Sequence, residues 1–144
     1  MAIDALLIRT DPIRSQVVDA DLGGAVTIGN VVYIAADDDI EAARANAAAT
    51  SKAVGLLVQL ATEIPGTTVG AAGDRGTVCN LGHVYCKGWG LTPGAIYYVS
   101  SSSAGAITAT APSGAGTWTA VVGYAIDADT LFVQPGALAP VSNS

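Results

Sequence analysis

The chain has 144 residues, of which 51% are apolar and 12% are charged, and a formal net charge of -6 at pH 7. Its length suits one domain with its own core, and a chain with 6 Lys and Arg residues cannot form the basic stripe that binds nucleic acid. No apolar run approaches the roughly 18 residues that cross a bilayer, and the first residues lack the pattern of a secretion signal, so we expect synthesis in a cytoplasm and no membrane partner.

The N-terminal segment, residues 1–16, has no counterpart elsewhere in the chain. It combines an apolar run with two cations, and its candidate contact residues are Leu6, Leu7, Ile8, Arg9 and Arg14. Such a segment predicts an arm that reaches a neighbouring protein, where the arginines pair with carboxylates. The alternative is that the segment completes the protomer's own sheet, as terminal strands often do.

Short runs of Val, Ile, Thr and Tyr follow the arm, separated by clusters of Gly, Ser, Asp and Pro. This pattern predicts an all-β fold, a compact barrel-like or sandwich-like domain over residues 17–136. The last residues, 137–144, form a tail of the kind that termini often leave loosely ordered. The predicted strands are residues 26–28, 31–35, 53–60, 77–80, 84–87, 96–100, 106–109, 118–125 and 130–134.

Residues 38–52 fit a helix when they are taken alone. Asp37, Asp38 or Asp39 can cap it, and the Ala, Glu and Arg residues that follow are strong helix formers. A helix here would be the one exception to the all-β pattern.

An internal repeat favours a hairpin in place of that helix. Residues 29–35 match residues 94–100, and residues 53–57 match residues 121–125 at nearly the same spacing. In the second copy the intervening residues form a turn and then a strand-like run. By analogy the aspartates form a turn and residues 40–44 the returning strand. The two related β halves are residues 23–60 and 88–136.

His83 is the one residue that titrates near neutrality without perturbation. Gly82 and His83 suit a two-residue hairpin turn, with Gly82 at the position that needs a positive φ. Counting outward from this turn makes Cys79 and Cys86 cross-strand neighbours, either two buried thiols or a disulfide. A lone turn histidine satisfies no catalytic template, so we predict no catalytic residue.

Two acidic clusters, residues 37–39 and 127–129, have the composition of cation ligands. Neither has the spacing, the glycine bend and the closing Glu of a calcium loop, and acidic residues commonly favour hairpin bends. The glycines at 70, 73 and 76 do not form a phosphate-binding loop. We therefore predict no metal, no cofactor and no small-molecule substrate.

The second half carries a specific pattern. Residues 90–100 are GLTPGAIYYVS, residues 104–108 are AGAIT, residues 121–125 are VVGYA and residues 131–136 are LFVQPG. This pattern resembles the GLTPGxxYYVS…GxIT…VVGxA…LxVxPG module of structural proteins of tailed bacteriophages. The module occurs in capsid decoration (cement) proteins and in some tail-fibre and baseplate proteins. The resemblance covers residues 76–136 and, more weakly, residues 23–60.

The resemblance implies a decoration protein, because the chain is little more than the doubled module, whereas fibres join such modules to long shafts. It further implies a homotrimer on the outer surface of the virion head, bound to the major capsid protein and without enzymatic activity. One alternative is a tail-fibre or baseplate component that binds a host-surface glycan, for which an exposed Trp89 or Trp118 would be the mark. The other is a depolymerase, which needs paired carboxylates, whereas Glu41 and Glu63 lie far apart in the sequence.

Overall fold

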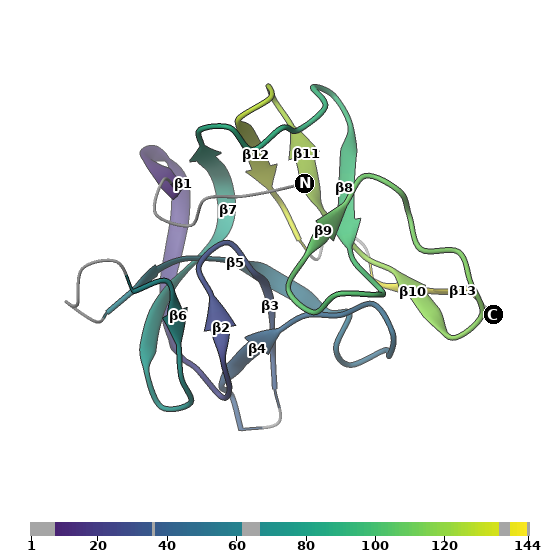
Figure 1. Cartoon of the computed structure of the whole chain (residues 1–144), viewed down its shortest axis with the longest axis horizontal. Helices are drawn as coiled ribbons and strands as arrows, with labels where there is room; N and C mark the ends of the chain where they lie inside the picture. The colour runs from purple at the N-terminus through teal and green to yellow at the C-terminus, as the bar shows by residue number, and fades with distance from the viewer. Residues whose placement is uncertain (1–7, 36, 62–66, 136–138, 144) are drawn as a thin grey trace.

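A computed structural model describes residues 8–35, 37–61, 67–135 and 139–143 (Figure 1). These residues form strands and no helix, which confirms the all-β prediction, and none of them forms a helix able to span a membrane. The strands are β1 (Ile8–Asp21), β2 (Val26–Thr27), β3 (Val31–Ile34), β4 (Ile40–Ala42), β5 (Ala53–Leu60), β6 (Val69–Gly70), β7 (Arg75–Cys86), β8 (Ile96–Val99), β9 (Ile107–Thr108), β10 (Thr117–Thr119), β11 (Val121–Ala125), β12 (Thr130–Val133) and β13 (Val141–Asn143).

The longest strands, β1 and β7, pair antiparallel from Ile8–Cys86 to Asp21–Arg75, with two register shifts between, and form a ribbon at one side of the molecule (Figure 1). The first part of β7 also pairs with β5, and its last part pairs with β12. These strands form one nine-stranded sheet, in the order β4-β3-β5-β7-β12-β11-β8-β9 with β1 beside β7. We call its β4-β3-β5-β7 part the first sheet and its β7-β12-β11-β8-β9 part the second sheet.

The hairpin predicted at Gly82 and His83 is wrong, because β7 runs through both residues without turning. Gly82 does have a positive φ, 122°. The reason lies in the partner strand: β1 has a register shift between Thr10 and Ser15, and a Cβ on residue 82 would collide with the backbone of Arg14 and Ser15. The glycine thus admits a bulge of the neighbouring strand.

The two halves repeat one set of strand pairings, at the alignment that the internal repeat predicts. In the first half β3 pairs with β5, and in the second half β8 pairs with β11, and each pairing contains one register shift. A Cβ on Gly55 would collide with the carbonyl oxygen of Cys79, and a Cβ on Gly123 would collide with that of Phe132. The pair Val31–Leu56 of the first half corresponds to Ile96–Tyr124 of the second half. In the same way, Val32–Gly55 corresponds to Tyr97–Gly123, and Tyr33–Ala53 corresponds to Tyr98–Val121.

Residues 37–52 contain the predicted hairpin, and the helix alternative is wrong. The Ala35 N–H donates to the Asp39 carbonyl at 2.7 Å across the turn, and Asp38 takes a φ of 65° there. Strand β4 then returns along β3. Ala43 and Ala45 have no exposed surface, and their backbones bond to β3 and to the second half, so close packing overrides the helix propensity of alanine.

The first sheet curls until the end of β1 meets β4. Leu22 and Ile40 form an isolated parallel bridge, and the Gly23 N–H donates to the Ile40 carbonyl at 2.9 Å. One hydrophobic core cluster contains residues of both sheets, including Leu57 from the first and Leu131 from the second.

Residues near both ends of the chain lie in paired strands, where the sequence predicts an arm and a loose tail. Residues 8–16, the C-terminal part of the predicted arm, lie in β1 and pair with β7, which is the alternative interpretation given above. Strand β13, in the predicted loose tail, pairs with β10, and the Asn143 Nδ2 donates to the Pro112 carbonyl at 2.7 Å. The rest of the predicted arm, residues 1–7, lies outside the described residues.

Candidate functional site

A row of large side chains crosses the second sheet on its outer surface. Cross-strand partners place His83 of β7, Phe132 of β12, Tyr124 of β11 and Ile96 of β8 side by side. The His83 and Phe132 rings meet edge to face with centroids 5.4 Å apart, and the Phe132 and Tyr124 centroids are 5.2 Å apart. Tyr124 is 44% exposed and Ile96 is 48% exposed. We call this surface, with the neighbouring Tyr85 and Ile126, the aromatic face.

The duplication makes this exposure unusual. The positions of the first sheet equivalent to Ile96 and Tyr124 are Val31 and Leu56, and both are completely buried. A sheet surface that is covered in the first half is therefore open in the second. Exposed apolar surface gathered in one patch is typical of an interaction site.

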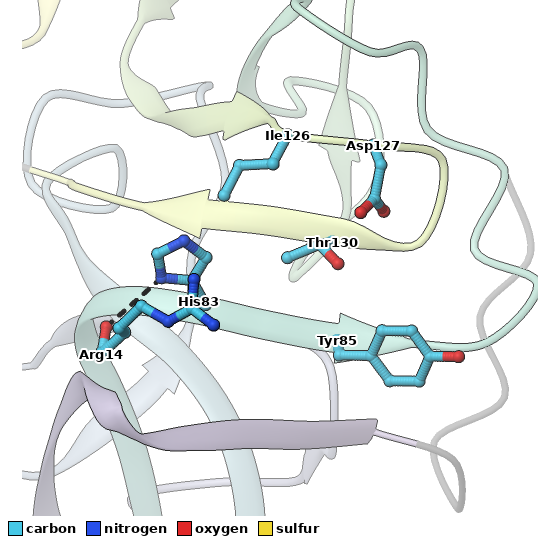
Figure 2. Close-up of a pocket in the computed structure, with 6 residues that line it drawn as sticks. All are labelled: Arg14, His83, Tyr85, Ile126, Asp127 and Thr130. Carbon is cyan, nitrogen blue, oxygen red and sulfur yellow. Dashed lines mark hydrogen bonds between the residues drawn. The ribbon is translucent and has the colours of Figure 1, made fainter.

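A shallow hollow of about 240 Å³ adjoins the aromatic face (Figure 2). Strand β7 contributes His83 and Tyr85 to it, and β12 contributes Thr130. Arg14 of β1 and Asp127 of the β11–β12 turn lie at its margins. One cation, one carboxylate, an imidazole and two hydroxyl groups thus surround the hollow, a set that can donate and accept hydrogen bonds.

The titratable groups of this hollow are engaged in local structure. The His83 Nδ1 lies 3.4 Å from the Arg14 carbonyl oxygen (Figure 2). The Asp127 carboxylate accepts the Asp129 N–H at 2.9 Å, and this bond, followed by bonds from Thr130, lowers the pKa of Asp127. Neither bond joins the imidazole to the carboxylate, so this arrangement suits recognition better than proton transfer.

The cross-strand pairing predicted for Cys79 and Cys86 is wrong, since both lie on β7, where they are buried and form no disulfide with each other. Seven residues of extended strand separate two α-carbons by roughly 20 Å, far beyond the reach of a disulfide. Burial raises the pKa of the Cys79 thiol, which keeps it protonated and unreactive.

Both acidic clusters lie in turns, as predicted. Asp127 caps the β11–β12 turn as described, and the Asp129 carboxylate accepts the Gly88 N–H at 3.0 Å. Within the described ranges, no three His, Cys, Asp or Glu side chains come together as a metal centre would require.

The structure separates the five contact residues predicted on the arm. Leu6 and Leu7 lie outside the described residues, and Ile8 is 6% exposed and packs in the core. Arg9 and Arg14 are exposed. Arg9 lies opposite Tyr85, and Arg14 lines the hollow, so β1 brings both cations to the edge of the aromatic face.

The aromatic face was not predicted from the sequence. Its signal was the strand alternation: Tyr124 lies between buried Gly123 and Ala125, and Phe132 lies between buried Leu131 and Val133. The chain matches no model of a known protein family, and no curated protein matches it either.

Proposed function

We propose that the protein is a decoration protein of a tailed bacteriophage, a homotrimer that binds the major capsid protein on the outer surface of the virion head. The observation that carries the proposal is where the phage-like module falls. The stretches of the module lie in the turn before β8 and in β8, β9, β11 and β12, and Ile96, Tyr124 and Phe132 of the aromatic face stand at positions that the module leaves open. The protein acts by binding, without catalysis.

The residues of the module have structural roles that support this assignment. Gly94 has a φ of 80° in the turn before β8. Tyr97 is 1% exposed, and its hydroxyl accepts the Thr92 N–H at 2.9 Å, which ties that turn to the core. These contacts fix the turn before β8 against the core, so the module builds the sheet that carries the aromatic face.

The mechanism is thermodynamic. A protein that binds the mature lattice and not its precursor stabilises the mature shell by mass action, by about 2.7 kcal/mol per site at a free concentration of one hundred times the Kd. Contacts across the joints between shell subunits then oppose the outward pressure of the packaged genome.

The alternative of a glycan-binding tail component loses part of its support. Trp89, one of the two residues expected to mark it, is 2% exposed, and Trp118 is half-buried. For a depolymerase, Glu41 of β4 is half-buried, and Glu63 lies outside the described residues.

The experiment mixes the purified chain with genome-free shells of the phage whose genome encodes it, in the mature and the precursor form. We expect saturable co-sedimentation with mature shells, little with precursor shells, and a higher temperature of shell disruption after binding. Binding to neither form, in a chain shown to be folded, would overturn the proposal.

A further inference from the structure

The β1–β7 ribbon carries a second open surface, at the end away from the aromatic face. It is a hollow of about 280 Å³ lined by residues of β1, β3, β4, β5 and β7 and of the β3–β4 turn. Its apolar wall includes Ile34, 56% exposed, and Val18, 45% exposed. Asp19 and Asp38 contribute carboxylates to its lining, and we call it the acidic hollow.

The acidic hollow and the aromatic face lie at different positions along the ribbon. Val78 and Asn80 of β7 line the hollow, whereas His83 and Tyr85, farther along the same strand, belong to the aromatic face. Because both surfaces are built on the same paired strands, one molecule cannot bring its own two surfaces together, but two copies can.

The two surfaces are complementary in charge. Two cations, Arg9 and Arg14, and one carboxylate, Asp127, are exposed beside the aromatic face, whereas Asp19 and Asp38 are exposed at the acidic hollow. Each surface also offers exposed apolar side chains. A contact between them would bury apolar area and place cations beside carboxylates.

We infer that the aromatic face of one copy docks into the acidic hollow of a second copy. The contact is head to tail, since it joins unlike surfaces, and such contacts close into a ring when the rotation between copies permits. This inference deepens the homotrimer of the proposed function by naming its interface.

Two matched variants test the inference by complementation. Tyr124→Asp disables the aromatic face and leaves the hollow intact, and Ile34→Asp does the reverse. Val141→Asp is the control, because Val141 is 61% exposed and belongs to neither surface. Circular dichroism and thermal melts establish that all three are folded, and sedimentation velocity measures their association.

We expect the wild type and the control to associate at low micromolar concentration, more weakly as salt rises from about 0.05 M to about 0.5 M. For each surface variant alone, the Kd of self-association should rise by a factor of about ten or more. In an equimolar mixture, the intact aromatic face of Ile34→Asp can dock into the intact hollow of Tyr124→Asp. The mixture should therefore form heterodimers, and these should grow no further because the two remaining surfaces of each pair are disabled. A monomeric wild type, a surface variant that associates normally, or a mixture without heterodimers would each overturn the inference.

These measurements need no shell. A monomeric chain that binds mature shells would refute the inferred contact and the homotrimer, and would leave the proposed role in binding the shell standing. A chain that assembles head to tail but binds no shell would do the opposite.

Discussion

The substitution Ile8→Ala tests whether the start of β1 belongs to the fold or to a docking arm. Ile8 is 6% exposed and lies opposite Cys86, which has no exposed surface. The change removes three buried carbons at about 0.8 kcal/mol each, and the cavity raises the cost to about 3 kcal/mol. In a chain of this size that loss lowers Tm by about 6–12 °C.

The assay is thermal unfolding followed by circular dichroism, with Gln16→Ala as the matched control. Gln16 is exposed on the same strand, so we expect its replacement to change stability by less than about 0.5 kcal/mol. An Ile8→Ala variant that melts within about 1 °C of the wild type would refute the placement of Ile8 in the core.

Further predictions concern single contacts. Gly123→Ala should destabilise the domain by about 2–3 kcal/mol in urea unfolding, because its Cβ collides with the backbone of β12, whereas Gly114→Ala, with open space around its Cβ, should cost far less. Tyr97→Phe should cost about 1 kcal/mol, since the Thr92 N–H loses its acceptor; no change in the melt would contradict that role. The pKa of Asp127 is lowered from 3.8, so its contribution to stability is present above about pH 4 and is lost as pH falls through the folded pKa. The Tm of Asp127→Asn should therefore fall less on acidification than the Tm of the wild type. The same dependence of Tm on pH in both proteins would argue against the hydrogen bond from the Asp129 N–H to the Asp127 carboxylate.

Local pattern was enough to predict the strands of the second half and the repeat. The match of residues 29–35 to residues 94–100 outweighed the helix propensity of the alanines around Ala43, because strand pairing repeats with the sequence that specifies it. Propensity alone would have placed a helix there.

The hairpin prediction at Gly82 failed because a glycine with a positive φ is compatible with two different backbone structures. The positive φ of Gly82 fits a hairpin turn and equally fits a bulge in an adjacent strand, and the difference depends on β1, which is 61 residues or more distant in sequence. The wrong turn then produced the wrong cysteine pairing. The acidic hollow is built from several separate strands, so no local stretch carries its signal.

The most direct test of the proposed function is an electron cryomicroscopy map of the virion, with mass spectrometry to establish that the chain is present. The account predicts trimeric all-β density on the outside of the head, over the joints between shell subunits, at regular positions across the lattice. Density for this chain in the tail or baseplate, or its absence from a head that contains all its other proteins, would contradict the account.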